Sequence, residues 1–362
     1  MAERTFAMLI SPSANRVYAR SALDLTSAEL GVFGETVLSA PLHDVRPEVI
    51  GGVSYLGFRG LPTGADLAVL SNTSTALALF ERVGDLLRPV PLTPLAVWAD
   101  DLVSVQKYAG KTNETFTQLL LNVTLAASVA GPALAGGAVG PALAGGAAGR
   151  SAGQRRVRVL DPLCGRGTTL NVALRYGFDV AGIESDAKDV EAYAAFLRSW
   201  LKRSRVKHTL TLRPVRHHGR PAARRMEATL AADAAAARAD DTQSVTVVEA
   251  ATERAEEFFR ARSMDAVVAD APYGVQHGSR ARGNLARSPL DLLAEAVPGW
   301  ARLLRPGGAL GLSWNTKVAP RAAVAGLLVD AGLEPCTTEA YAGFSHRVDQ
   351  AIQRDLIVAR RR

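Results

Sequence analysis

The second half of the sequence alternates between short apolar runs that suit buried strands and longer amphipathic runs that suit helices. We expect strands at residues 157–160, 178–183, 245–248, 266–269 and 309–314. We expect helices at residues 169–176, 187–203, 251–262, 289–304 and 320–331. Because regular alternation of this kind places parallel strands between crossover helices, it predicts an α/β sheet. Two final segments, at about 334–341 and 351–359, are expected to form a terminal antiparallel pair.

Residues 1–104 have a different pattern and predict a separate, smaller domain of α/β or α+β type. Short apolar segments at 4–10, 66–70 and 95–98 predict strands, while 21–33 and 73–87 have helical patterns. Nothing in this region suggests catalysis. A chain of 362 residues, 48% of them hydrophobic, is long enough for two domains with a sizeable core.

Between the two domains lie a helical segment, residues 105–130, and a linker, residues 131–155. After a cap at Asn113, apolar side chains recur at helical spacing at Phe116, Leu119, Leu120 and Val123. The linker contains GPALAGGA twice, and glycine and proline at this density predict a flexible chain. The uncharged stretch 123–149 is rich in Ala and Gly and contains prolines, so its weak apolar driving force does not favour a membrane span.

Cysteine usage bears on location and on metal binding. The chain has only Cys164 and Cys336, without a CxxC pair or a His/Cys cluster, so we expect neither a disulfide framework nor a metal site. A reducing cytoplasm is the expected compartment. The first residues mix charges into a very short apolar run, and a signal peptide is therefore not expected.

An insertion at residues 202–240 interrupts the alternation of the larger domain, which spans residues 156–362. Its first part, 202–226, holds nine Lys/Arg, three His and no acid, within a chain of net charge +7. We expect a basic hairpin here, followed by an Ala-rich helix or loop at 227–239. A solvated surface insertion and a contact with nucleic acid both remain open.

A glycine-rich turn, VRVLDPLCGRGTTL at residues 157–170, is the first motif that indicates a ligand site. Glycines at 165 and 167 let a ligand approach the backbone, and the helix that follows offers free N–H groups. A Walker phosphate loop is excluded because its Gly-Lys-Thr is absent here. A nicotinamide oxidoreductase is disfavoured, since Leu170 replaces the third glycine and Asp161 would repel a pyrophosphate.

The two acids of this region favour a different cofactor. Asp161 would attract an ammonium group, and Glu184, about twenty residues beyond the loop, occupies the position that commonly binds ribose hydroxyls. An ammonium and a ribose together describe S-adenosylmethionine better than NAD.

Three segments now support a family resemblance. DPLCGRGTTL resembles the Asp-Pro-Phe-Cys-Gly-Ser-Gly-Thr loop of class I S-adenosylmethionine-dependent RNA methylases, and DAPYG, at 270–274, resembles their Asp-Pro-Pro-Tyr-Gly motif. YAGKTNETF, at 108–116, is similar to the segment that precedes their catalytic core. The nearest resemblance is to the tRNA guanine-N2 methylases, whose members often carry a THUMP-containing N-terminal region. It covers about 106–362 and implies a Rossmann-like sheet, mostly parallel with a terminal antiparallel strand, and a THUMP-like RNA-binding domain at 1–104.

The resemblance implies a target, an exocyclic amine of an RNA base, most simply guanine N2 of tRNA. Asp270 and the carbonyl of Ala271 would accept its two N–H groups and aim the nitrogen lone pair at the methyl group. Pro272 would stiffen the turn, and Tyr273 would stack on the extruded base. These four residues are the expected catalytic set.

The remaining site residues follow from the same resemblance. Cofactor contacts are expected at Asp161, Pro162, Cys164, Gly165, Gly167, Thr168, Glu184 and Glu249. Substrate contacts are expected at Lys111, Arg280 and Arg282. Two positions depart from the family pattern: Ala271 replaces the first proline, and Glu249 is the nearest acid where an aspartate usually meets the adenine amine. An amino-methyltransferase acting on DNA or protein glutamine, and a non-catalytic RNA-binding protein on a methylase scaffold, remain alternatives.

Overall fold

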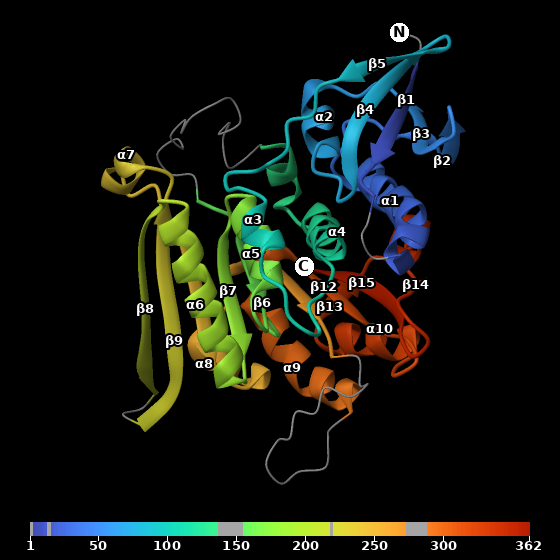
Figure 1. Ribbon diagram of the computed structural model, residues 1–362. Coiled ribbons are helices and arrows are strands. Elements are labelled where there is room, and N and C mark those ends of the chain that lie inside the picture. Colours follow the sequence, from blue (N-terminus) through green and yellow to red (C-terminus); the bar gives the residue numbers. More distant parts are fainter. Residues whose placement is uncertain (1–2, 13–15, 137–154, 218–219, 273–287) are drawn as a thin grey trace.

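The structure, a computed structural model, describes residues 3–12, 16–136, 155–217, 220–272 and 288–362 (Figure 1). It contains two sheets, a five-stranded sheet from the N-terminal part and a ten-stranded sheet from the rest of the chain. No helix in the described ranges is both long enough and apolar enough to cross a membrane.

The N-terminal part is an antiparallel sheet with two helices. Its elements are β1 (Arg4–Ile10), α1 (Arg16–Thr36), β2 (His43–Ile50), β3 (Val53–Gly60), α2 (Gly64–Leu70), β4 (Ala76–Val83) and β5 (Leu86–Val90). All neighbouring strands are antiparallel, in the order β2-β3-β1-β4-β5. The β-α-β-β-α-β sequence of its first six elements is that of a ferredoxin-like split βαβ unit, so this part is of α+β type.

Three sequence predictions in this part are wrong. Residues 66–70 lie in helix α2, which begins with a capping box between Thr63 and Asp66, rather than in a strand. Residues 73–87 form strands β4 and β5 rather than a helix, and 95–98 form no strand. Periodicity alone does not distinguish a strand from a helix in a short apolar run such as 66–70, which explains that error.

A buried helix connects the two sheets. The connecting elements are α3 (Asp101–Ser104), α4 (Glu114–Ala126) and the 3-10 helix η1 (Gly131–Ala135). Asn113 caps α4 as expected, by accepting a hydrogen bond from the Phe116 N–H. Glycine at 311 in strand β12 (Leu304–Asn315) lets α4 approach the larger sheet, because a Cβ there would collide with Thr124. Residues 131–135 are folded, so any flexible linker starts later, and 137–154 lie outside the described residues.

The larger sheet is mostly parallel. Its other strands are β6 (Arg158–Asp161), β7 (Asp179–Glu184), β8 (Lys207–His217), β9 (Arg220–Ala231), β10 (Gln243–Glu249), β11 (Met264–Asp270), β13 (Leu333–Pro335), β14 (His346–Arg347) and β15 (Gln353–Arg361). The central order β10-β7-β6-β11-β12 is the 3-2-1-4-5 order of doubly wound sheets. Strand β15 lies antiparallel between β12 and β13. The expected Rossmann-like sheet with a terminal antiparallel strand is therefore confirmed.

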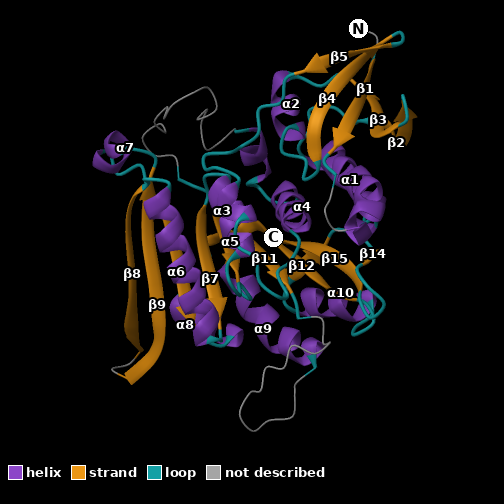
Figure 2. Cartoon of the chain, viewed as in Figure 1, coloured by secondary structure: helices purple, strands orange, loops and turns teal. Residues whose placement is uncertain are grey.

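Helices cover both faces of this sheet (Figure 2). They are α5 (Thr168–Arg175), α6 (Ala187–Arg203), α7 (Ala234–Arg238), η2 (Thr252–Arg254), α8 (Ala255–Phe258), α9 (Pro289–Leu303), α10 (Arg321–Asp330) and α11 (Glu339–Ala342). Val159 belongs to the apolar cluster of one face and Leu160 to that of the other, and both are fully buried. Because these strands are buried on both faces, nearly every position is apolar, which explains the continuous apolar runs in the sequence.

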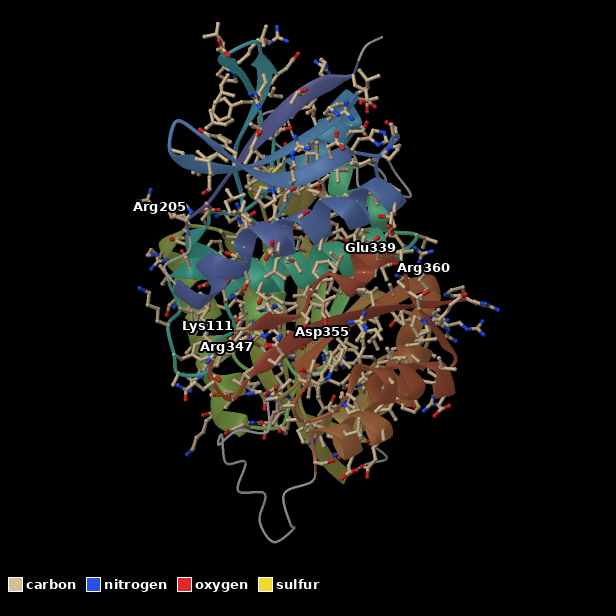
Figure 3. The ribbon with its side chains drawn as sticks, turned by 90° about the vertical axis from the view of Figure 1, so that its right-hand side faces the viewer. Lys111, Arg205, Glu339, Arg347, Asp355 and Arg360 are labelled. Carbon is tan, nitrogen blue, oxygen red and sulfur yellow. The ribbon has the colours of Figure 1, made fainter. Side chains whose placement is uncertain are left out.

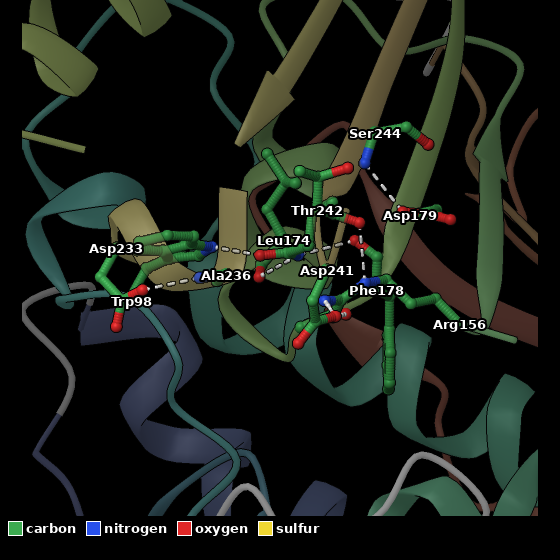
Figure 4. Close-up of polar contacts among 12 residues, drawn as sticks. Trp98, Arg156, Leu174, Phe178, Asp179, Asp233, Ala236, Asp241, Thr242 and Ser244 are labelled. Atoms are coloured by element: carbon green, nitrogen blue, oxygen red, sulfur yellow. Dashed lines mark hydrogen bonds and ion pairs between the residues drawn. The ribbon is translucent and has the colours of Figure 1, made fainter. Parts of the chain in front are cut away.

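The amino ends of the parallel strands are closed by polar contacts with loops (Figure 4). Arg156 forms an ion pair with Asp241 at 2.5 Å and donates to the Thr242 carbonyl at 3.0 Å. The Asp179 carboxylate accepts from the Ser244 N–H at 2.8 Å. This end of the sheet is occupied by structural contacts, in contrast to the carboxyl end.

A buried polar network joins helix α1 to α4 and to Tyr176, which follows Arg175 at the end of a helix of the larger domain. The Glu29 carboxylate is fully buried and accepts hydrogen bonds from the Ser74 hydroxyl at 2.6 Å and the Asn122 amide at 2.7 Å. Asn122 in turn accepts from the Tyr176 hydroxyl at 3.0 Å. Burial raises the pKa of Glu29 from 4.5 to about 7, although its hydrogen bonds act in the opposite direction.

We expect Glu29→Gln to stabilise the protein at pH 8 but not at pH 5. Between pH 4.5 and 7 the folded state binds a proton that the unfolded state has released, so stability falls as pH rises through this window. At pH 8 ionisation of Glu29 lowers the free energy of unfolding by about 3 kcal/mol. Gln carries no charge, so the variant does not lose this stability. Urea unfolding of both proteins at pH 5 and pH 8 measures the effect. An equal pH dependence in the two proteins would show that Glu29 does not titrate in this range.

Candidate functional site

Four carboxylates lie at the carboxyl edge of the larger sheet, one at the end of each of four strands. They are Asp161 on β6, Glu184 on β7, Glu249 on β10 and Asp270 on β11. Glu184 and Glu249 are direct partners in the strand register. Strands β6 and β11 are neighbours, and the strand order reverses between them. Ligands of doubly wound sheets bind outside the carboxyl ends at such a point, so the two sequence motifs share one candidate site.

The glycine turn after β6 has little space. Gly167 has φ +83° and precedes helix α5, and a Cβ on it would lie 2.7 Å from two ring carbons of the buried Tyr193. Gly165 also has positive φ, +49°, but a Cβ there would meet nothing within 4 Å. The Cys164 thiol is buried, and burial raises its pKa well above the ordinary value, which does not suit a nucleophile.

Glu184 is attached to this turn by backbone hydrogen bonds. Its Oε2 accepts from the Gly165 N–H at 3.0 Å, and its Oε1 accepts from the Asp186 N–H at 2.7 Å. Burial raises the pKa of Glu184. The glutamate at the predicted ribose position therefore also holds the turn in place.

Asp161 is the most deeply buried of the four carboxylates, with 4% of its surface exposed. Its Oδ1 accepts from the Leu163 N–H at 3.0 Å. Burial raises its pKa from 3.8 to about 7, with further contributions from the charges of Asp270 and Glu184. A cation placed beside Asp161 would reverse this effect by stabilising the charged carboxylate. Pro162 follows it and is also buried.

The segment before α4 contacts both motifs, which the sequence patterns did not predict. The Tyr108 hydroxyl lies 3.0 Å from the Thr168 hydroxyl at the start of α5. The Arg166 guanidinium lies 5.0 Å from the Tyr108 ring centroid. The Thr112 hydroxyl donates to Asp270 Oδ2 at 2.6 Å. Only the similarity of residues 108–116 to a known segment had drawn attention to this part of the sequence.

Lys111, for which a substrate contact is expected, makes structural contacts. Its ammonium donates to the carbonyls of Val103 at 2.8 Å and Gln106 at 2.7 Å, and it forms an ion pair with Glu114. These contacts use its three N–H groups, so the described conformation leaves none for a substrate. Lys111 instead fixes the loop that carries Tyr108 and Thr112 (Figure 3).

The expected catalytic turn is described only in part. Ala271 is buried, and its N–H donates to the Ser313 carbonyl at 2.8 Å, which joins the turn to strand β12. Pro272 follows and is exposed. The expected site residues Tyr273, Arg280 and Arg282 lie outside the described residues.

Glu249 is held by an arginine of the inserted hairpin. Arg224 on β9 forms ion pairs with Glu249 and, at 2.7 Å, with Glu191 on α6. The carboxylate at the predicted adenine position is therefore already balanced by a cation, which no motif in the sequence indicated.

A second feature that the sequence did not predict lies beside Asp270. The Arg354 guanidinium, from β15, stacks over the Phe116 ring of α4 at 4.3 Å, and the His346 ring lies 5.3 Å from the same ring. Both polar residues are buried, and burial lowers the pKa of His346. Within the described ranges, no group of three or more His, Cys, Asp and Glu side chains is placed to hold a metal ion.

Comparisons with known proteins yield distant structural similarities only. No family model and no curated protein sequence matches this chain. TrmN from Thermus thermophilus is 16% identical over 88% of this chain and 59% of its own, with TM-score 0.39. This chain thus spans less than two thirds of the length of TrmN.

Two further solved structures have similar values. A TehB-like SAM-dependent methyltransferase from Corynebacterium glutamicum is 14% identical, over 57% of this chain and 82% of its own, with TM-score 0.33. An rRNA methylase from Streptococcus thermophilus is 10% identical, over 57% and 87%, with TM-score 0.31. The sheet order of this chain, its terminal antiparallel strand and the glycine turn where the order reverses together give the described part of residues 156–362 a doubly wound, Rossmann-like fold.

Proposed function

We propose that this chain transfers the methyl group of S-adenosylmethionine to an exocyclic amine of an RNA base, with guanine N2 of tRNA as the target. The observation that carries the proposal is the position of the Asp161 turn and the Asp270–Ala271 turn at the ends of the adjacent strands β6 and β11. A donor over the first turn and a base against the second would therefore meet at one edge of the sheet.

The cofactor half of the site rests on its acids and on the glycine turn. Asp161 would pair with the ammonium group of the cofactor, and Glu184 would accept from its ribose hydroxyls. Gly165 leaves the backbone open to a close approach, since a Cβ there would meet nothing within 4 Å, whereas Gly167 makes room for the Tyr193 ring. Glu249 remains the acceptor proposed for the adenine amine, although it must serve while paired with Arg224. The cofactor, when bound, supplies an electrophilic methyl group on a good leaving group.

The substrate half rests on two acceptors held next to each other. The Asp270 carboxylate and the Ala271 carbonyl would accept the two N–H groups of the target amine, which frees its lone pair from the ring as the nitrogen becomes tetrahedral. Thr112 fixes one carboxylate oxygen, so the orientation of Asp270 is set before a substrate arrives. As the N–C bond forms, the bond between the methyl group and the sulfonium sulfur breaks, and the nitrogen then loses one proton, which Asp270 would take.

Nucleoside analysis by mass spectrometry tests the substrate assignment. tRNA from cells with and without the gene is digested and compared, and we expect the loss of one N2-methylated guanosine. Incubation of the purified protein with labelled S-adenosylmethionine and, separately, tRNA, DNA and a glutamine-containing peptide examines the alternatives. Methyl transfer to DNA or to the peptide alone would contradict the proposed substrate.

We expect binding of S-adenosylmethionine to strengthen as pH rises to about 7 and then to level off. Below that pH Asp161 is protonated in the free protein, because its pKa is raised to about 7, and pairing with an ammonium requires the charged carboxylate. The dissociation constant should therefore fall by up to about tenfold per pH unit between pH 5 and 7, with proton release. Calorimetry in two buffers of different ionisation enthalpy measures the released proton.

Asp161→Asn is the control for this prediction, because it should bind weakly and without the pH dependence. No detectable cofactor binding by the unaltered protein, with RNA binding intact, would support the non-catalytic RNA-binding alternative instead.

A further inference from the structure

The nine Lys/Arg residues of the basic insertion form two groups at opposite ends of its hairpin. Strand β8 has 11 residues, which corresponds to about 35 Å of extended chain. Four of the nine Lys/Arg residues, Lys202, Arg203, Arg205 and Lys207, precede it or begin it, at the amino edge of the sheet. The other five, Arg213, Arg216, Arg220, Arg224 and Arg225, lie in its far half. Arg205 accordingly lies far above Lys111 and its loop (Figure 3).

The far half of the hairpin extends beyond the carboxyl edge of the sheet. The last residue of β10, Glu249, is the register partner of Arg224. Strand β9 begins at Arg220, so four of its residues project past the end of β10, a length of about 13 Å. Strands β8 and β9 extend below β7 at the same end (Figure 1). The projecting part therefore lies beyond the end of β10, on the Glu249 side of the row of four carboxylates.

The hairpin is fixed to this edge. Arg224 pairs with Glu249 on β10 and with Glu191 on α6, so the root of the projecting part is tied to two neighbouring elements. Because its root is fixed, the arm loses less conformational entropy when it contacts a ligand, and less binding free energy is spent on ordering it.

The far half of the hairpin also brings arginines of its two strands together. Arg213 and Arg225 face each other directly across the hairpin, although like charges in this position repel. Arg225 lies 3.5 Å from Glu227, whereas Arg213 is exposed and has no acidic partner among the described residues. Segment 207–226 contains no Asp or Glu at all. Several arginines in a segment without acids suit a polyanion.

We propose that the far half of the β8–β9 hairpin is an arm that binds the phosphate backbone of the RNA next to the target nucleotide. This inference rests on the proposed function for its choice of RNA. Asp161, Glu184 and Asp270 at this edge would repel a polyanion, and the arm would supply compensating positive charge on the Glu249 side of the site. The Lys/Arg residues at the other end of the hairpin are too distant to take part.

Two triple variants that remove the same amount of charge test the arm. The first is Arg213→Gln, Arg216→Gln and Arg220→Gln, and its matched control is Lys202→Gln, Arg205→Gln and Lys207→Gln. Binding of a fluorescein-labelled, unmodified tRNA transcript is followed by anisotropy over a series of salt concentrations. A DNA hairpin of equal length is measured in parallel, and calorimetry with S-adenosylmethionine reports on the cofactor site.

We expect the first variant to bind the transcript at least about tenfold more weakly, with a salt slope reduced by about 2, because each lost phosphate contact lowers it by somewhat less than 1. The control should change the slope by less than about 0.5. Cofactor binding should be the same in all three proteins. A failure of the unaltered protein to bind the cofactor would refute the proposed function while leaving the RNA result interpretable.

Three results would overturn the arm. The first is equal weakening of RNA binding by both triple variants, which would indicate an effect of net charge alone. The second is unchanged RNA binding by the first variant. The third is an equal loss of affinity for the DNA hairpin, which would mean that the arm is not specific for RNA. Thermal melting of both variants shows whether they are folded, and the single variant Arg213→Gln, at an exposed position, tests the same arm with the least disturbance.

Discussion

Asp270→Asn is expected to lower kcat for methyl transfer by about 10²–10³-fold while leaving cofactor affinity within about twofold. Asn keeps the size of the side chain and can still accept from Thr112, so the turn between β11 and Ala271 should persist. It loses the negative charge that stabilises the amine as the nitrogen becomes positive, and it cannot take the proton. Single-turnover transfer to tRNA separates this chemical step from binding and product release.

Thr112→Val provides a graded comparison for the same carboxylate. It removes the hydrogen bond that orients Asp270 but keeps the charge, so we expect a smaller loss, of about tenfold. If Asp270→Asn retained activity within a factor of about ten, equivalent to 1.4 kcal/mol, the role given to this aspartate would be wrong.

Gly167→Ala is expected to lower the free energy of unfolding by about 3 kcal/mol and to weaken cofactor binding. Gly167 has φ +83°, where a Cβ is strained by about 1–2 kcal/mol. The new methyl group would also lie 2.7 Å from ring carbons of Tyr193, which is buried and donates to Asn171 at 3.1 Å. Displacing a packed ring adds a further 1–3 kcal/mol. Urea unfolding measures the combined effect.

Gly332→Ala is the matched control, since Gly332 has a similar φ of +78° and a Cβ there meets nothing within 4 Å. It should show the backbone strain alone, about 1 kcal/mol, and leave cofactor binding unchanged. Equal losses in the two variants would mean that Tyr193 moves aside freely and that the close contact does not constrain the turn.

Much of the larger domain could be predicted from the sequence. Helix α6 spans the predicted residues, and all five predicted parallel strands are present, because strands buried on both faces need apolar residues at every position. The antiparallel N-terminal sheet was harder to predict. Within residues 76–83, for example, only the buried positions 79 and 81 alternate with the half-buried positions 78 and 80, and the helical pattern assigned to this region competed with that short signal.

The candidate site was predicted in outline and completed by the fold. The two acidic turns could be placed together because the carboxyl ends of parallel strands share one edge. The structural contacts of Lys111 could not be predicted, because its partners include local carbonyls, which carry no sequence signal. The expected flexible linker started too early, since Leu134 is held by a hydrogen bond between its carbonyl and the distant Asn72.

The sequence by itself determined the sheet, its chain of crossover helices and the acids that end four of its five central strands, since these follow from local periodicity and from the order of elements. Only the tertiary structure decided which groups surround those acids. Tyr108 reaches Thr168 across 60 positions, and Thr112 reaches Asp270 across 158. Such pairs arise from the packing of α4 and its preceding loop against the sheet, and no periodicity within either segment encodes them.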